Sequence, residues 1–325
     1  MKVAIIGTGF GRSVMEPMFQ SLGWETILVP ARDSDGIKQV CANGVDLVSI
    51  HSPPFLHHDH VMWALDHKRN VNCDKPFGRN AAEARAMRDR ARELGVLNFL
   101  NCEFRRKPAR VKLHQLIGSG ALGAVKHMNW TTFGNGFRSG RQTWVFDRDL
   151  GGGWIRSWGS HVVDQIRWLF DSEVADCGGL TRIDLPTRLD LEGAEHPSKA
   201  EDAFVAWLRM KSGATALIDS SWGAAAYAQP RVILSCKDAL VELDARETTL
   251  TVKRAGQPDE VFEFTPRGGD PHEDMMIPWL TEVEQSIREE RQISPSFEDG
   301  AAMVEALDRM HANSVHVEAP SLCPS

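Results

Sequence analysis

The N-terminal stretch of residues 3–12 reads Val-Ala-Ile-Ile-Gly-Thr-Gly-Phe-Gly-Arg. Its first four residues predict a short buried strand, and the glycines after it permit a tight turn in which backbone N–H groups approach a pyrophosphate. The third glycine of the usual dinucleotide-binding turn falls on Arg12, with Gly11 one place early. The stretch therefore predicts a cofactor-binding turn made of Gly7, Thr8, Gly9, Phe10, Gly11 and Arg12.

The first 120 residues alternate short apolar segments with helical patterns, which predicts right-handed βαβ units and a parallel sheet covered on both faces. The expected strands are 3–6, 26–29, 47–50, 71–73 and 97–100. The expected helices are 12–22, 36–43, 55–68, 80–94 and 108–117. Asn80 and Glu83 have the spacing of a capping box at the start of one helix, and Gly95 ends it.

The residues after the second expected strand bear on which dinucleotide is bound. NAD usually requires an acid at the end of that strand to hold the ribose 2′-hydroxyl. The segment after Val29 reads Pro-Ala-Arg-Asp, so Asp33 comes one residue late for this role. Arg32 could pair with a 2′-phosphate, and Arg12 could lie near the same edge. These residues favour NADP, with NAD as the alternative.

An amine stands at the end of the fourth expected strand, where residues 72–76 read Asn-Cys-Asp-Lys-Pro. Pro76 prevents the segment from continuing as a central strand. Lys75 is therefore presented at the carboxyl end of a strand, where open α/β sheets bind their ligands. A lysine at such an edge is usually a solvated surface residue, so the motifs elsewhere in the chain decide its interpretation.

The second half of the chain has a different pattern. After residues 120–123, Gly-Ala-Leu-Gly, a loop rich in Gly, Arg and Trp covers 134–158 and a helical stretch follows. Consecutive strand patterns joined by short turns then indicate an antiparallel sheet, and two helices come last. The strand patterns are 202–210, 214–222, 231–235, 239–243, 248–253 and 260–264; the helices are 159–170, 272–290 and 297–313. We expect a Rossmann domain over 1–120 and a second α/β domain over 121–325, whose C-terminal helices are free to pack back on the first domain.

A second concentrated signal surrounds one histidine. Three glycines, 151–153, precede Trp154, and the helix after them begins Gly-Ser-His with His161. His161 and Asp164 are three apart, so both point the same way from the start of that helix. A histidine beside a carboxylate is a plausible proton acceptor, and the alternative is a histidine with a capping or packing role.

Composition narrows the classes of partner. The 325 residues are 42% hydrophobic and 25% charged, as in an ordinary globular protein, and a net charge of −7 without a long basic run argues against nucleic-acid or anionic-membrane partners. No apolar run approaches the roughly 20 residues needed to span a bilayer. The first strand pattern leaves no room for a signal peptide, and the cysteines are scattered singly, so we expect reduced thiols and a cytoplasmic location.

Five motifs in order make the chain resemble the Gfo/Idh/MocA oxidoreductase family, which includes glucose–fructose oxidoreductase and inositol dehydrogenase. The motifs are Gly7-Thr8-Gly9, Ser52-Pro53-Pro54-Phe55-Leu56-His57, Asp74-Lys75-Pro76, Gly120-Ala121-Leu122-Gly123 and Gly151-Gly152-Gly153 through His161-Val162-Val163-Asp164. Asp74-Lys75-Pro76 corresponds to the Glu-Lys-Pro of the family. The likeness covers nearly the whole chain.

The resemblance implies an α/β fold: an N-terminal Rossmann domain, then a domain with a large, predominantly antiparallel open sheet that is available for homodimer or homotetramer contacts. It implies that Lys75 lies by the nicotinamide and the reacting hydroxyl, that His161 is the acid/base, and that Asp164 contacts substrate or orients His161. It also implies that Ser52, Pro53 and His57 line the nicotinamide side of the cofactor cleft. We further expect Arg32, Asp74 and Lys75 among the cofactor-binding residues. The expected substrate-binding residues are Arg105, Trp144, Arg156, Ser157, Trp158, His161 and Asp164.

One position departs from the family. Many members have an acid four residues before the histidine, where this chain has Ser157. Serine does not ionise near neutral pH and cannot stabilise an imidazolium as a carboxylate would. Proton handling therefore depends more on Asp164 or on Lys75 itself.

These observations predict an NAD(P)-dependent oxidoreductase that transfers a hydride between nicotinamide and a secondary alcohol or ketone of a carbohydrate-like substrate. The alternatives are an NAD(P)-binding regulator or scaffold without turnover, and a glycosidase that uses nicotinamide for transient oxidation. The histidine cluster of 57, 58, 60 and 67 invites a metal interpretation, but His58 points away from the face that His57 and His60 share and no second shell of ligands is identifiable, so we expect no metal.

Overall fold

The computed structural model describes residues 1–244, 246–266 and 270–318. The chain divides into two compact units. Unit 1 comprises Met1–Lys107 and Pro266–Glu305, and unit 2 comprises Pro108–Thr265 and Ala306–Ser325. Residues 108–120, assigned above to the Rossmann domain, thus belong to unit 2, and residues 266–305 belong to unit 1. None of the helices in the described residues is both long and apolar enough to cross a membrane.

Unit 1 contains a five-stranded parallel sheet in the order β2-β1-β3-β4-β5. Its strands are β1 Lys2–Ile6, β2 Glu25–Val29, β3 Leu47–Ile50, β4 Asn70–Asp74 and β5 Asn98–Asn101. The strand order reverses between β1 and β3, and their carboxyl ends form the topological switch point at which doubly wound sheets bind ligands. All five expected strands are confirmed to within two residues.

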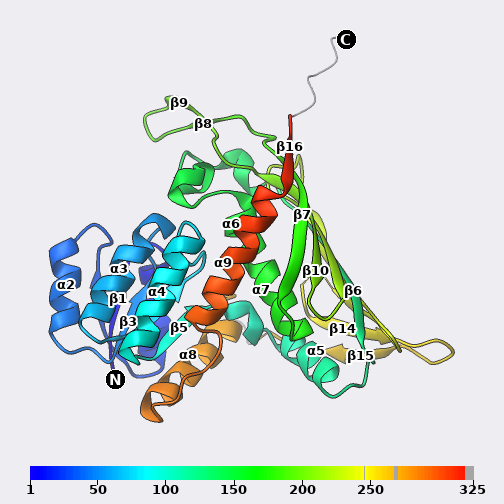
Figure 1. Ribbon diagram of the computed structural model, residues 1–325, viewed down its shortest axis with the longest axis horizontal. Helices are drawn as coiled ribbons and strands as arrows, with labels where there is room; N and C mark the ends of the chain where they lie inside the picture. The colour runs from blue at the N-terminus through cyan, green and yellow to red at the C-terminus, as the bar shows by residue number, and fades with distance from the viewer. Residues whose placement is uncertain (245, 267–269, 319–325) are drawn as a thin grey trace. The chain divides into compact units, whose positions relative to one another are not determined.

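Helices connect these strands. They are η1 Gly11–Met15, α1 Glu16–Ser21, α2 Ser34–Ala42, α3 Pro54–Asp66, α4 Ala81–Leu94, η2 Glu103–Arg106 and α8 Glu273–Arg288. Helices α2, α3 and α4 lie side by side along the sheet (Figure 1). The predicted capping box is present, because the Asn80 side chain accepts a hydrogen bond from the backbone N–H of Glu83 and Gly95 ends α4 in a left-handed conformation.

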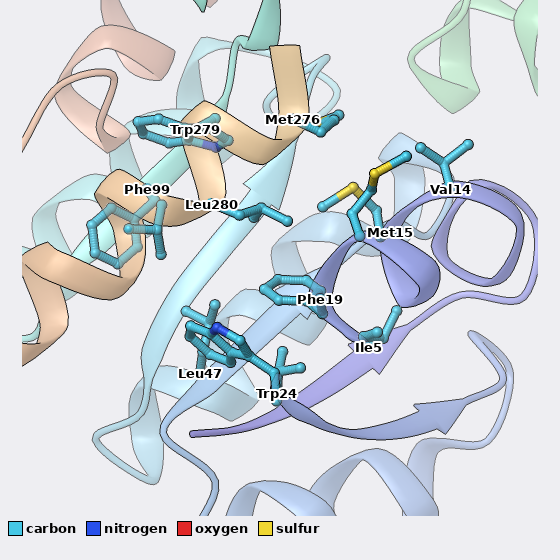
Figure 2. Packing of buried hydrophobic residues seen from close by; sticks show 13 residues of the cluster. Ile5, Val14, Met15, Phe19, Trp24, Leu47, Phe99, Met276, Trp279 and Leu280 are labelled. Atoms are coloured by element: carbon cyan, nitrogen blue, oxygen red, sulfur yellow. The ribbon is translucent and has the colours of Figure 1, made fainter. Parts of the chain in front are cut away.

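Helix α8 comes late in the sequence but packs into the core of unit 1. Met276 and Leu280 of α8 point toward Met15 and Phe19, on the face of the sheet that η1 and α1 cover, and Trp279 lies edge-on to the ring of Phe99 (Figure 2). All six side chains are buried. This apolar packing explains why residues from beyond 265 belong to the N-terminal unit.

Unit 2 contains a nine-stranded sheet in the order β15-β14-β13-β12-β6-β11-β10-β7-β16. Most neighbouring strands are antiparallel; β11 with β6, and β16 with β7, are parallel. Its strands are β6 Val125–Phe133, β7 Val174–Arg182, β10 Ala203–Met210, β11 Thr215–Ser221, β12 Ala228–Cys236, β13 Leu240–Leu243, β14 Thr249–Lys253, β15 Glu260–Glu263 and β16 Ser314–Val317. The pair β8 Thr187–Leu189 and β9 Glu195–Pro197 forms a separate hairpin.

The helices of unit 2 are short apart from two. They are α5 Pro108–Gly118, η3 Gly136–Ser139, η4 Trp144–Phe146, η5 Arg148–Leu150, α6 Trp154–Ser157 and α7 Gly159–Phe170. Helix α7 lies along one face of the sheet (Figure 1). Helix α9, Phe297–Ala312, crosses the division between the units at Glu305.

The other face of the sheet in unit 2 exposes apolar side chains. Leu180 of β7 is in register with Val205 of β10 and with Val315 of β16. All three side chains are exposed, as is Trp207 two residues along β10. An apolar patch spread over three adjacent strands is typical of an interaction surface.

Five strands of unit 2 were not predicted from the sequence: β6, β7, β8, β9 and β16. Strand β7 carries two adjacent glycines, which are unfavourable in strands. They fit here because a Cβ at Gly179 would overlap the carbonyl oxygen of Val205 on the neighbouring strand. Tertiary packing therefore overrides the weak strand signal of this segment.

Candidate functional site

The glycine-rich turn joins β1 to η1 at the switch point of unit 1. Gly7 has φ +117°, and a Cβ there would lie 2.6 Å from the carbonyl oxygen of His51, so only glycine fits. A Cβ at Gly9 would meet nothing within 4 Å. The backbone is therefore accessible at Gly9, next to the start of a helix, which is the arrangement that accommodates a pyrophosphate. These residues fit a dinucleotide.

The end of β2 presents a guanidinium rather than a carboxylate. The side chain of Asp33 caps α2, accepting a hydrogen bond from the backbone N–H of Gly36 at 3.0 Å. Arg32 is exposed, and so is Arg12 in the glycine-rich turn. Asp33 therefore has a structural role as the cap of α2. Arg32 remains accessible at the edge where a ribose would lie.

The end of β3 is tied to the end of β4 by a histidine. His57 of α3 is buried, with Nε2 2.6 Å from the carbonyl oxygen of Ser52 and Nδ1 3.0 Å from that of Pro76. Burial lowers the pKa of His57, although Asp74 and the two carbonyls oppose the shift. His57, expected to line the cofactor cleft, therefore connects the segments that carry Ser52, Pro53 and Lys75.

Asp74, the acid before Lys75, is the centre of a polar network at the carboxyl ends of β3, β4 and β5. Its two oxygens face His51 Nδ1 at 3.0 Å and Asn101 Nδ2 at 2.6 Å. His51 Nε2 in turn lies 2.7 Å from the hydroxyl of Ser49, which accepts from Asn72. Every link is satisfied if the Ser49 hydroxyl donates to His51 and His51 donates to Asp74.

This network fixes the charge of Asp74. Burial favours the protonated form of its carboxyl group, but His51, the hydrogen bonds from His51 and Asn101, and the charge of Lys75 outweigh it and lower the pKa of Asp74. Asp74 was among the site residues predicted from the sequence, whereas His51, Ser49, Asn72 and Asn101 were not. Their only signal in the sequence is that each polar residue lies within or just after a short buried strand.

Lys75 itself is partly buried. A second carboxyl group near it, Glu103, was also missed by the sequence analysis. Glu103 begins η2 directly after β5, is 7% exposed, and interacts electrostatically with Lys75. Lys75 thus lies near two carboxyl groups contributed by adjacent strand ends.

Arg105, predicted among the substrate-binding residues, lies in a buried ion pair within unit 1. Its guanidinium is buried and bonds the Ser294 hydroxyl and the Asp299 carboxylate, each at 2.9 Å. All three residues belong to unit 1. The ion pair connects η2 to the first turn of α9, and the hydrogen bond to Ser294 connects η2 to the segment before that helix.

In unit 2 a buried acid holds the triple-glycine segment. Glu201 accepts a hydrogen bond from the backbone N–H of Ile155 at 3.0 Å, and its carbonyl accepts one from Trp154 at 2.8 Å. A Cβ at Gly153 would overlap the Glu201 carboxylate. Glycine is therefore required where the segment passes this acid, and Glu201 positions the start of α6.

Aromatic side chains gather around α6. Trp154 stacks on Trp158 with ring centroids 5.8 Å apart and on Trp222 with centroids 5.0 Å apart. Trp158 lies 5.8 Å from the ring of His161 and is partly exposed. Trp144, in η4, is also partly exposed, while Trp154 is buried.

The acid/base candidates of unit 2 lie at the start of α7. His161 and Asp164 are both buried, and they occupy the same side of the helix as their spacing predicts. The Ser157 hydroxyl donates to the carbonyl of Gly153 at 2.8 Å, which gives it a local role. Arg156 forms an ion pair with Asp308 of α9.

Among the residues that the structure describes, no three His, Cys, Asp or Glu side chains are grouped so as to hold a metal ion. The histidines that invited this interpretation are otherwise engaged. His60 Nδ1 lies 3.0 Å from the Ser52 hydroxyl, and burial together with the neighbouring His57 lowers the pKa of His60 to about 4. His57 and His60 both contact Ser52 and so hold the loop after β3 in place.

The switch point, the glycine-rich turn and the polar strand ends define unit 1 as a dinucleotide-binding domain of the Rossmann type. Two family models match the chain: residues 1–102 match the oxidoreductase family with an NAD-binding Rossmann fold, and residues 111–242 match the GFO/IDH/MocA C-terminal domain. The chain belongs to the GFO/IDH/MocA family.

The individual proteins described next are between 12% and 30% identical to this chain over the matched residues. An uncharacterized oxidoreductase from Synechocystis sp. is 30% identical over 190 residues, which cover 52% of this chain and 51% of that protein, so the chain matches about half the length of this relative. Levoglucosan dehydrogenase in complex with NADH and L-sorbose has the same fold, with a TM-score of 0.84 and 19% identity over 96% of both chains. A super-repressor mutant of Gal80p from Saccharomyces cerevisiae also shares it, with a TM-score of 0.83 and 12% identity over 96% of this chain and 95% of that one.

Proposed function

We propose that this protein is an NAD(P)-dependent oxidoreductase that interconverts a secondary alcohol and a ketone on a sugar, a polyol or a related cyclic substrate. The observation that carries the proposal is Lys75, presented at the end of β4 beside an ionised Asp74, on the same sheet edge as the glycine-rich turn. Family membership and the sugar and NADH bound in the levoglucosan dehydrogenase neighbour support it.

The cofactor residues follow from the geometry of unit 1. Gly7 to Arg12 would hold the pyrophosphate, and Ser52 and Pro53 would lie toward the nicotinamide. The bound dinucleotide supplies hydride transfer. The exposed Arg32 and the capping role of Asp33 support NADP over NAD, because a guanidinium pairs with a 2′-phosphate and Asp33 is already engaged.

Lys75 would donate a hydrogen bond to the reacting oxygen and stabilise its developing negative charge in the transition state. His161 would exchange the hydroxyl proton, with Asp164 orienting its ring or contacting substrate. The partly exposed rings of Trp144 and Trp158 would offer apolar faces to a sugar ring, and Arg156 and Ser157 would border them.

The test is to replace Lys75 with Met and His161 with Ala and to measure cofactor binding and turnover separately. We expect each variant to retain NAD(P)H affinity and to lose roughly 10²- to 10⁴-fold in kcat for a sugar or polyol found by a screen at 340 nm. Lys126→Met, at an exposed lysine of β6, is the matched control and should keep full turnover. Undiminished turnover in both site variants would refute the assignment.

A regulator without turnover is the second candidate, favoured by Ser157 in place of an acid and by the fold shared with Gal80p. It predicts tight NAD(P)H binding and no absorbance change at 340 nm with any alcohol in the screen. A glycosidase with transient oxidation would instead release product without net change in the cofactor.

We also propose that the exposed apolar face of unit 2 forms a homodimer or homotetramer contact, because Leu180, Val205 and Val315 are aligned across three strands. Trp207→Arg should lower the mass measured by analytical ultracentrifugation. Leu191→Arg, at an exposed position of the β8–β9 hairpin, should leave it unchanged. A monomeric unaltered protein would refute this contact.

A further inference from the structure

Glu103 is a buried acid to which the proposed chemistry assigns no role. It lies at the start of η2, and its Oε2 atom is inaccessible to solvent and has no hydrogen-bond partner among the described residues. Leaving such an atom unpaired is costly in a protein interior, so an unpaired carboxylate oxygen calls for an explanation.

Strand register places Glu103 on the same edge as Lys75. Strands β4 and β5 are parallel neighbours with Asp74 opposite Asn101, and the 2.6 Å hydrogen bond between these side chains fixes the pair. Lys75 follows Asp74, and Glu103 comes two residues after Asn101. Both therefore leave the sheet at adjacent strand ends.

The two carboxyl groups near Lys75 differ in their ability to take up a proton. Both oxygens of Asp74 face hydrogen-bonding groups, and its pKa is lowered. For Glu103, burial raises the pKa to about 7, while Lys75 opposes and Asp74 adds to the rise. Environments that make the pKa values of two neighbouring acids differ in this way are typical of acid/base sites.

The other charged groups around Glu103 are accounted for. His272, before α8, acts on Glu103 and has its own partner in Asp270 at 2.6 Å. Glu282 of α8, which packs against η2, is paired with Arg106, and Asp299 is paired with Arg105. Of the cations that act on Glu103, Lys75 has the largest effect.

We propose that Glu103 exchanges protons with the substrate through Lys75, so that the pair provides a proton route alongside His161. The proposal rests on the oxidoreductase function proposed above. In alcohol oxidation the hydroxyl proton passes to Lys75 while Lys75, on moving within hydrogen-bond distance of Glu103, passes an ammonium proton to the Glu103 carboxylate, which becomes a carboxylic acid. The carbon-bound hydrogen leaves with its electron pair to an oxidised nicotinamide dinucleotide, the alcohol becomes a ketone, and Lys75 ends in its starting state. Glu103 is thus a positioning and proton-holding residue that acts through Lys75.

The route predicts the direction in which the rates of oxidation and reduction change with pH. Oxidation requires ionised Glu103, so its rate rises as pH increases through about 7. Reduction requires protonated Glu103, so its rate falls over the same range. Ser157 stands where many family members have an acid four residues before the histidine, and a serine cannot take the part of that acid in proton transfer near neutral pH.

The first experiment needs no substrate or cofactor. The carbon next to the amine of each lysine is ¹³C-labelled, the Lys75 signal is identified by its loss in Lys75→Met, and the unliganded protein is titrated by NMR. We expect an inflection of the Lys75 signal near pH 7 that is absent from Glu103→Gln and persists in His272→Gln. Persistence in Glu103→Gln, or loss only in His272→Gln, would overturn the proposal.

An infrared titration keeps the proposal falsifiable if Glu103→Gln is poorly folded. The unaltered protein should gain a carboxylic acid C=O band between pH 8 and pH 6, and Glu103→Asp should shift that band in frequency. A spectrum without such a band would show that no buried carboxyl group takes up a proton over this range, and the proposal would be wrong.

The second experiment uses turnover of an alcohol found by the screen. Glu103→Gln should lower kcat for oxidation roughly 10- to 100-fold and remove its rise through pH 7, with NAD(P)H affinity unchanged. Glu298→Gln, at an exposed acid of α9, is the matched control. If the unaltered protein turns over no alcohol, the proposed function fails while the NMR result still stands. If turnover is present but the Lys75 signal does not respond to Glu103, the route is wrong and the function stands.

Discussion

Different interactions hold two regions of the molecule in place: the carboxyl edge of the sheet in unit 1, and the segment of residues 134–158 in unit 2. At the sheet edge each polar residue lies at a strand end, and its neighbours follow from strand order and register. Segment 134–158 has only short helical turns. Two residues outside the segment hold it: Glu201 accepts a hydrogen bond from Ile155, and the ring of Trp222 stacks on that of Trp154.

This difference indicates where each region can change. A residue at the sheet edge contacts hydrogen-bonded neighbours on adjacent strands, so a substitution there disturbs the cofactor side of the site. Most backbone hydrogen bonds of the loop lie within its own short turns and only a few reach other segments, so its shape can change while the sheet of unit 2 stays intact. We expect cofactor binding to depend on the first region and substrate choice on the second.

The largest effect is expected at Gly7. Gly7→Ala should lower the free energy of unfolding by about 3 kcal/mol, because the new Cβ would meet the His51 carbonyl at a positive φ. Urea denaturation of the unliganded protein measures it. Gly9→Ala, where the added Cβ meets open space, should cost less than about 1 kcal/mol and still weaken NAD(P)H binding. Equal destabilisation by both substitutions would contradict the close approach at Gly7.

The corresponding test of the loop is Glu201→Ala, which removes the acceptor of the Ile155 N–H and the partner of Arg148 and His311. We expect the free energy of unfolding to fall by about 2 kcal/mol and KM for substrate to rise, with NAD(P)H affinity unchanged. Glu192→Ala, at an exposed acid, is the control. A loss of cofactor affinity equal to the loss of substrate affinity would remove the contrast between the two regions.

Asp74→Asn tests the charge of the polar network. The folded-state pKa of Asp74 is lowered, so its contribution to stability is present above the ordinary carboxyl range and is lost as pH falls through the folded-state value. At pH 7 the substitution should cost about 1–2 kcal/mol, and the difference from the unaltered protein should shrink between pH 4 and pH 2. Denaturation curves at several pH values measure it, with the exposed Asp35→Asn as control. A difference that does not depend on pH would mean that shape rather than charge matters.

The smallest expected effect concerns the choice of dinucleotide. Arg32→Ala should weaken NADPH binding about 10-fold, the loss of one charge-assisted contact, and change NADH binding less than about twofold. Fluorescence titration with both cofactors measures it, and Arg231→Ala, at an exposed arginine of β12, is the control. Equal effects on NADH and NADPH would favour NAD as the cofactor.

The fold of unit 1 could be predicted because its signals are local: apolar runs, a glycine-rich turn and a helix cap, each within a few residues. The missed strands of unit 2 depend on distant partners. Strand β7 is stabilised by β10 and β16. Its glycine at position 179 is explained only by the close approach of Val205 on the neighbouring strand, which leaves no room for a Cβ. No local pattern contains that information.

The candidate site divides in the same way. Lys75 and the glycine-rich turn were identifiable because Pro76 and the glycines mark strand ends in the sequence. Glu103 and His51 were not, because a polar residue after a strand is ordinary until burial and partners are known. The ion pair of Arg105 could not be predicted either, because its partner Asp299 lies almost 200 residues away in the sequence.

Helix α9 makes neither unit a contiguous piece of chain. Its first half packs Phe297 on Phe77 of unit 1, and its second half places Leu307 and Met310 beside Gly159 of unit 2. A chain cut before residue 297 would therefore lose buried side chains from both units at once. A gene fragment that ends at the boundary between the two family matches would encode an incomplete core, and swapping the N-terminal half between relatives requires carrying the C-terminal helices with it.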